Sequence, residues 1–116
     1  MFDFRPDAGT PKPEAYRQLY EAAEALTAGE PDGVANMANV AALLWEFLPD
    51  CNWTGFYRMV EGELVLGPFV GRPACIRIPV GQGVCGVTAQ SGQTQLVEDV
   101  HAFPGHIACD GDTKSE

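Results

Sequence analysis

Three of the four cysteines and both histidines of this 116-residue chain lie within the stretch 67–112. These cysteines are Cys75, Cys85 and Cys109, with spacings of ten and then 24 positions. Neither spacing matches the short paired intervals of a zinc finger or ribbon, nor the C-x-x-C of a thioredoxin-like redox site. Each cysteine has a different local context, so any contact between them depends on the fold. The pattern therefore favours thiol redox chemistry over metal binding.

Two cysteines stand where an inert thiol is the usual finding. Cys51 comes just before an expected strand, and a free thiol, buried or half-buried, is the better account of it. Cys75 lies in the run 74–78, which is typical of a short strand, where a core cysteine is the ordinary explanation. From the residues alone, a redox role for Cys75 is the minority interpretation.

The other two cysteines have neighbours that could activate a thiol. Cys85 follows a glycine-rich turn at 81–83, at the start of a predicted helix, where backbone amides and the helix dipole stabilise a thiolate and lower its pKa. Cys109 lies in an expected loop between His106 and Asp110. The imidazole could pair with a thiolate at Cys109, whereas the carboxylate would oppose it. Helix-end physics therefore nominates Cys85.

Other groupings of polar residues indicate no further chemistry. The histidines His101 and His106 are irregularly spaced from the cysteines, so we expect no metal site. The glycines at 81 and 83 lack a following lysine and form no phosphate loop. The neighbours Glu98 and Asp99 are typical of a solvated acidic turn. We expect no cofactor.

Composition narrows the class of partner. The chain has a formal net charge of −9, with seven Lys and Arg against 16 Asp and Glu. Nucleic acids and anionic membrane surfaces require clustered positive charge, so neither is an expected partner. The first residues, MFDFRPD, lack the pattern of a signal peptide, and no apolar run is long enough for a membrane span. We therefore expect a cytoplasmic protein whose thiols stay reduced unless they are catalytic or sensing.

Two helices are predicted in the N-terminal half, after a leader over residues 1–12 that contains too much Pro and Gly for regular structure. Apolar residues recur at three and four positions from Pro13 to Leu26, and Gly29 ends that helix. Asp32 is a candidate N-cap for a second amphipathic helix, which Pro49 ends. These helices are expected to cover a sheet face or a dimer seam.

Short strands dominate the second half. Residues 53–60 and 63–69 alternate around the Glu61-Gly62 turn and predict an antiparallel hairpin, with Trp53, Gly55, Tyr57 and Met59 on one face. A third strand is expected over 74–78, a helix over 84–90, a strand over 95–97 and an irregular segment over 98–114. The order predicts an α+β domain with an antiparallel sheet. Because the chain stops soon after a long loop, we expect the C-terminal part of the domain to be missing.

Five runs of sequence resemble one enzyme family. They are NWTGFY (52–57), LVLGPFVGRPACIRIP (64–79), GQGVCGVTA (81–89), QTQLVEDVHAFPGHIACD (93–110) and SE (115–116). Together they resemble the free methionine-(R)-sulfoxide reductases, small cytosolic oxidoreductases built on a GAF domain, from about Ala15 to Glu116. The resemblance implies that residues 13–116 form a GAF-like domain, with N-terminal helices packed on the antiparallel sheet and the C-terminal strands lacking.

The resemblance also implies a set of roles. The substrate is free L-methionine-(R)-sulfoxide, attacked by Cys109, with Cys75 as the disulfide partner and Cys85 in reserve. This assignment differs from the helix-end argument for Cys85. A sulfenic acid forms on the attacking cysteine, condenses to an intramolecular disulfide, and is recycled by a thioredoxin-type reductant.

Three further residues receive roles from the family. Glu116 matches an acid near the sulfoxide oxygen, and Trp53 and Tyr57 match positions at the substrate. Taken alone, the two aromatic residues are typical core residues. With the C-terminal strands missing, we expect the chain to be weakly active or inactive. The rival hypothesis is a non-catalytic GAF-type module that binds a small molecule or acts as a sensor, which would have no need for three such cysteines.

Overall fold

The computed structural model describes residues 5–116, so the first four residues of the predicted leader lie outside the described part. The chain divides into two compact units, each described here by itself. The first unit comprises the chain up to Phe56 together with Pro68–Gly71. The second unit comprises Tyr57–Gly67 together with Arg72–Glu116.

Both predicted N-terminal helices are present in the first unit. Helix α1 spans Lys12–Thr27, with a proline in its first turn, where the ring costs no hydrogen bond. Helix α2 spans Gly33–Phe47. The Asp32 carboxylate accepts a hydrogen bond from the amide of Ala35 at 2.9 Å, which confirms the predicted N-cap.

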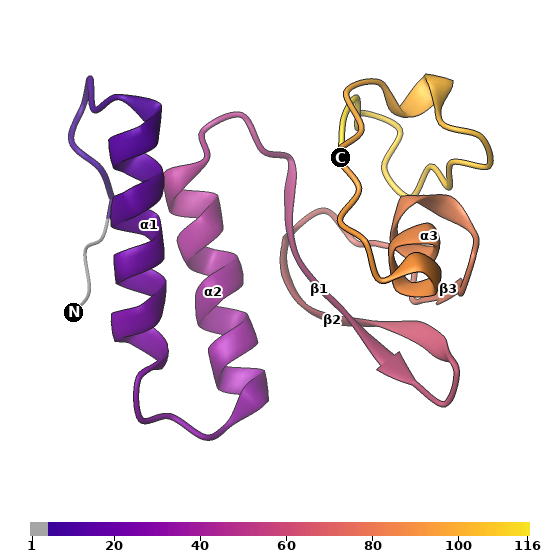
Figure 1. Cartoon of the computed structure of the whole chain (residues 1–116), viewed down its shortest axis with the longest axis horizontal. Helices are drawn as coiled ribbons and strands as arrows, with labels where there is room; N and C mark the ends of the chain where they lie inside the picture. The colour runs from indigo at the N-terminus through magenta and orange to yellow at the C-terminus, as the bar shows by residue number, and fades with distance from the viewer. Residues whose placement is uncertain (1–4) are drawn as a thin grey trace. The chain divides into compact units, whose positions relative to one another are not determined.

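The two helices lie side by side and pack through small and large apolar residues (Figure 1). Ala22 of α1 is buried against Leu43 and Phe47 of α2, and Leu19 and Ala23 pack around them. The predicted apolar stripes match this core only in part, because Leu19 and Ala23 lie in it while Tyr16, Tyr20 and Val34 are exposed. The helices therefore form their own small core.

Strands β1 (Trp53–Val60) and β2 (Glu63–Gly71) form the predicted hairpin. Glu61 and Gly62 both have positive φ, +49° and +84°, the backbone conformation of a type I′ turn. Within the first unit, the Thr54 hydroxyl donates to the carbonyl oxygen of Ala41 at 2.9 Å, which fixes the start of β1 to α2. The hairpin prediction is confirmed.

The third strand lies further along the chain than predicted. Strand β3 spans Arg77–Pro79 and pairs antiparallel with β2, with Leu64 opposite Ile78. The prediction of a strand over 74–78 is wrong for Cys75, which lies in the connecting segment. Its carbonyl oxygen accepts a hydrogen bond from the Tyr57 hydroxyl instead of joining the ladder. The fold is nevertheless α+β with an antiparallel sheet in the order β1-β2-β3.

Helix α3 spans Gly83–Ser91, close to the predicted range. It packs against β3 at very short range, because a Cβ built on Gly86 would lie 2.5 Å from the carbonyl oxygen of Pro79. The Gly86 carbonyl also accepts a hydrogen bond from the amide of Gly81 at 2.8 Å. Glycine at position 86 therefore sets how closely α3 approaches the sheet.

The segment after α3 is irregular apart from one 3-10 turn, η1 (Val100–Ala102). The predicted strand over 95–97 does not form. Val97 instead exchanges two backbone hydrogen bonds with Glu116, at 2.6 and 2.9 Å, and the amide of Val100 donates to the carbonyl of Lys114. The chain end thus lies beside the segment that follows α3, as Figure 1 shows.

Candidate active site

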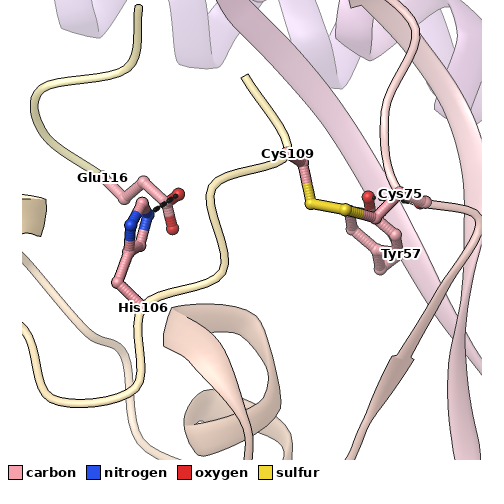
Figure 2. Close-up of a disulfide and its surroundings, with 5 residues drawn as sticks. All are labelled: Tyr57, Cys75, His106, Cys109 and Glu116. Carbon is pink, nitrogen blue, oxygen red and sulfur yellow. Dashed lines mark hydrogen bonds and ion pairs between the residues drawn. A yellow bond between two sulfur atoms is a disulfide. The ribbon is translucent and has the colours of Figure 1, made fainter. Parts of the chain in front are cut away.

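Cys75 and Cys109 are joined by a disulfide, and their Cα atoms lie 5.4 Å apart (Figure 2). The pairing is the one that the family resemblance implies. The bond joins the connection between β2 and β3 to the long C-terminal segment, across 34 positions of sequence. Cys51 and Cys85 are free, and both are half-buried. The structure therefore contains one disulfide and one nearby element, α3, that carries a free thiol.

The Cys75 side of the disulfide is held by hydrogen bonds to the hairpin. The Tyr57 hydroxyl donates to the carbonyl oxygen of Cys75 at 2.7 Å, and the amide of Leu66 donates to the carbonyl of Ile76 at 2.9 Å. Burial raises the pKa of the Tyr57 hydroxyl, and the nearby Cys85 and Glu116 raise it further. Tyr57 therefore remains a neutral hydrogen-bond donor across a wide range of pH.

The segment that follows Cys109 is held by ion pairs with Arg72. The Arg72 guanidinium lies 3.2 Å from a carboxylate oxygen of Asp112 and 3.8 Å from one of Asp110. Asp110 also accepts a hydrogen bond from the amide of Asp112 at 2.9 Å. A cleft of about 280 Å³ lies here, lined by Arg72, Pro73, Cys109, Asp110 and Gly111. The Cys109 end of the disulfide therefore faces an open cleft.

Glu116 lies near the disulfide and is anchored twice. Its backbone pairs with Val97, and one carboxylate oxygen lies 3.3 Å from Nε2 of His106 (Figure 2). The His106 side chain is 12% exposed and the Glu116 side chain 33%. Glu116 is also close enough to affect the titration of Cys85 and Tyr57. The Glu116 carboxyl group, the Cys85 thiol and the Tyr57 phenol are therefore close enough to affect one another.

Cys85 is the third residue of α3, and the predicted lowering of its pKa is wrong. Burial raises the pKa of the Cys85 thiol, and the Glu116 carboxylate raises it further. A helix N-terminus favours the thiolate, but here the loss of solvent and a neighbouring negative charge outweigh that effect. At neutral pH the Cys85 thiol is therefore less reactive than the sequence predicts.

Two of the remaining residues singled out in the sequence, Trp53 and Cys51, belong to the first unit. Trp53 lies in the first unit, where its ring stacks on that of Phe69 with centroids 5.4 Å apart. Cys51 is also in the first unit, half-buried. Over residues 5–116, no group of three or more His, Cys, Asp or Glu residues could hold a metal ion. Within the same range, none of the helices has the length and apolar character needed to cross a membrane.

Sequence reasoning missed three contacts around the disulfide. They are the hydrogen bond from Tyr57 to Cys75, the pairing of Arg72 with Asp110 and Asp112, and the contact between His106 and Glu116. The contact of Arg72 with Asp112 and that of His106 with Glu116 join residues 40 and ten positions apart, with no helical or strand periodicity to place them together. Only the position of His106 within the HAFPGHIACD run could have indicated a role.

Comparison with known proteins gives consistent results. No protein-family model matches the sequence. The free methionine-R-sulfoxide reductase of Escherichia coli is 53% identical over 105 residues, which cover 90% of this chain and 64% of that protein. The structure of free methionine-R-sulfoxide reductase from Neisseria meningitidis, in complex with its substrate, is 43% identical with a TM-score of 0.90, covering 96% of this chain and 67% of that one. A solved GAF domain is 42% identical with a TM-score of 0.92, covering 97% of this chain and 67% of that one. The chain therefore spans about two thirds of the length of these relatives.

Proposed function

This chain belongs to the free methionine-(R)-sulfoxide reductases, oxidoreductases with the GAF fold, and from this membership we propose that it reduces free L-methionine-(R)-sulfoxide to methionine. The observation that carries the proposal is the disulfide between Cys75 and Cys109. Two cysteines 34 positions apart, brought together in a disulfide, are what a thiol-based reductase needs and what a simple binding pocket does not.

The first step transfers oxygen from the substrate to Cys109. The thiolate of Cys109 attacks the sulfoxide sulfur, and the oxygen ends on the cysteine as a sulfenic acid while methionine leaves. The balance of this step requires one proton for that oxygen. We assign its delivery to Glu116, whose side chain is only partly exposed, whose backbone pairs with Val97 and whose carboxyl group contacts His106.

The second step forms the disulfide. The thiol of Cys75 attacks the sulfenic sulfur of Cys109, the sulfur–sulfur bond forms, and water leaves. A separation of 5.4 Å between the two Cα atoms lies within the range that a disulfide spans, so this step needs no large movement of the backbone.

The third step restores the two thiols. A thioredoxin-type dithiol attacks the disulfide, forms a mixed disulfide and resolves it, leaving both cysteines reduced. The open cleft lined by Arg72, Pro73, Cys109, Asp110 and Gly111 supports this proposal, because an external thiol needs access to one of the two sulfurs.

The activity is tested by coupling NADPH oxidation to the chain through thioredoxin and thioredoxin reductase. Any turnover, even a slow one, should be confined to the free R epimer, with none for the S epimer and a much lower rate for methionine sulfoxide held within a peptide. Binding of the R epimer without any methionine formed would favour the sensor hypothesis instead. Equal rates for free and peptide-bound sulfoxide would contradict the proposed substrate.

The cysteine roles are tested in the same assay. Cys109→Ser is expected to abolish turnover, and Cys75→Ser to release about one methionine per chain and then stop with thioredoxin as the reductant. Cys51→Ser is the matched control and should keep the wild-type rate, because Cys51 lies in the first unit and forms no disulfide. Activity retained in Cys109→Ser but lost in Cys85→Ser would move the nucleophile to Cys85.

A further inference from the structure

His106 makes a contact that the three steps above do not use. Its Nε2 atom lies 3.3 Å from a carboxylate oxygen of Glu116, and only 12% of its side chain is exposed. Polar groups that are mostly buried usually have a hydrogen-bond partner, and Glu116 supplies one for this ring. His106 lies three residues before Cys109, on the same segment that carries the attacking thiol.

The side-chain contact is not needed to close this segment. The backbone of Val97 already makes two hydrogen bonds with Glu116, and the amide of Val100 donates to the carbonyl of Lys114. These bonds fix where the Glu116 backbone lies. They do not fix the orientation of its carboxyl group, which rotates about three side-chain bonds. The contact with His106 is what restricts that rotation.

We propose that His106 is a positioning residue for the acid Glu116, an inference that rests on the proposed function. The Nε2–H group of the imidazole donates to one carboxyl oxygen of Glu116, which directs the other oxygen and its proton towards the sulfoxide. When that proton passes to the oxygen leaving the substrate sulfur, Glu116 becomes a carboxylate. The same N–H group then stabilises the new negative charge through a charge-assisted hydrogen bond.

The groups around Glu116 explain why its carboxyl group needs a hydrogen-bond donor. The titratable groups near its carboxyl include His106, Cys85 and Tyr57. A thiolate or phenolate at the latter two positions would repel a carboxylate, and both groups have a raised pKa with Glu116 among the causes. Of the three, only the imidazole can offset the charge that Glu116 acquires when it gives up its proton.

The test separates oxygen transfer from sulfoxide, which needs the acid, from oxidation by hydrogen peroxide, where solvent protonates the departing hydroxide. Reduced wild-type chain, His106→Ala, His106→Gln and His101→Ala are each mixed with free L-methionine-(R)-sulfoxide without any reductant. The rate of methionine formation is measured by chromatography of quenched samples. In a parallel arm the same proteins receive hydrogen peroxide, and formation of the Cys75–Cys109 disulfide is followed by mass spectrometry. His101 is a matched control because it is an exposed histidine of the same segment.

In His106→Ala we expect methionine formation to slow by at least about tenfold, part of the roughly 10²- to 10⁴-fold that a positioned acid contributes. Its peroxide arm should stay within about twofold of wild type. His106→Gln, whose side-chain amide can donate a similar hydrogen bond, should recover most of the loss. His101→Ala should match wild type in both arms.

Three outcomes would overturn the inference. One is His106→Ala forming methionine within about twofold of wild type. Another is an equal slowing in both arms, which would make His106 a structural support for Cys109. The third is no recovery in His106→Gln. Failure of the proposed function is distinguishable, because wild type itself would then form no methionine from sulfoxide while still forming the disulfide with peroxide.

Discussion

At the scale of single residues, Tyr57 combines two features that a sequence pattern cannot separate. We propose from the family resemblance that its ring contacts the substrate, whereas its hydroxyl donates to the carbonyl oxygen of Cys75. A net hydrogen bond of this kind is worth about 0.5–1.5 kcal/mol. That is enough to bias the segment carrying Cys75 towards the position from which it reaches Cys109. In this proposal the ring of Tyr57 contacts the substrate, and its hydroxyl supports the disulfide.

The environment of Cys85 gives a prediction about thiol reactivity. Burial and the Glu116 carboxylate both raise the pKa of this thiol, so its thiolate should appear only above the pH at which an ordinary cysteine ionises. The reduced chain is alkylated with iodoacetamide over a range of pH, and modification of Cys85 is followed by peptide mapping. The midpoint pH of this reaction should lie above that of a cysteine peptide. Glu116→Gln should lower the midpoint by removing the second cause.

The control for this experiment is a variant at another carboxylate. Glu98→Gln removes an exposed carboxylate from the same segment and should leave the midpoint at Cys85 unchanged. A midpoint equal to that of a cysteine peptide in the wild-type chain would show that the N-terminus of α3 offsets the effects of burial and of Glu116.

How far the site can be predicted from sequence depends on the range of the interaction. The disulfide pairing followed from resemblance to a family, not from the local context of Cys75, which indicated an inert core thiol. Local reasoning about Cys85 gave the wrong direction for its pKa, because burial and Glu116 come from distant parts of the chain. The contact of His106 with Glu116 depends on the path of an irregular segment, which has no periodicity to read.

At the scale of elements, the predictions that rest on local signals are confirmed, and those that depend on long-range contacts are not. The hairpin of β1 and β2 was predictable because its alternation and its Glu61-Gly62 turn are local signals. The short strand β3 was displaced because the residues before it are bound to partners outside the ladder, through the Tyr57 hydroxyl and the disulfide. Segment 95–97 pairs with a single distant residue, Glu116, so it forms no strand.

The close packing of α3 on β3 gives a prediction at this scale. Alanine is ordinarily about 1 kcal/mol more favourable than glycine inside a helix. A Cβ at position 86, however, would lie 2.5 Å from a backbone oxygen of Pro79, which cannot rotate away. We expect Gly86→Ala to lower the free energy of unfolding by roughly 1–3 kcal/mol, measured by urea denaturation.

Gly33→Ala is the matched control for that variant. Gly33 begins α2, and a Cβ there would meet no atom within 4 Å. This substitution should leave stability unchanged or slightly increased. If Gly86→Ala were as well tolerated as Gly33→Ala, α3 could move away from β3 at little cost.

At the scale of the whole molecule, the disulfide ties together positions 34 residues apart in the second unit. A cross-link of this span removes conformations from the unfolded chain, by about 3–4 kcal/mol in the chain-entropy treatment. The oxidised and reduced forms should therefore differ in stability far more than in secondary structure, because the hairpin and helices have their own hydrogen bonds.

We predict that dithiothreitol lowers the free energy of unfolding of the chain by about 3 kcal/mol, with little change in its far-ultraviolet circular dichroism before unfolding. Urea denaturation with and without the reductant measures the difference. Cys51→Ser should show the same response to dithiothreitol, and Cys75→Ser none. A difference below about 1 kcal/mol in the wild-type chain would mean that the reduced, unfolded chain stays compact in this region.

The paired backbone bonds of Val97 and Glu116 have a consequence for dynamics. They bring together the two ends of an eighteen-residue loop, slightly longer than an Ω-loop but closed in the same way, and this loop carries both His106 and Cys109. Such a loop opens as one cooperative unit, so the amide protons of Val97, Val100 and Glu116 should share one hydrogen-exchange rate. In the oxidised chain the disulfide from Cys109 to Cys75 also holds this loop. These amides should therefore exchange slowly in the oxidised chain and faster, together, after reduction. Each catalytic cycle would then alternate between a clamped loop and one free to open, and solvent exchange at three amides would report which state is populated.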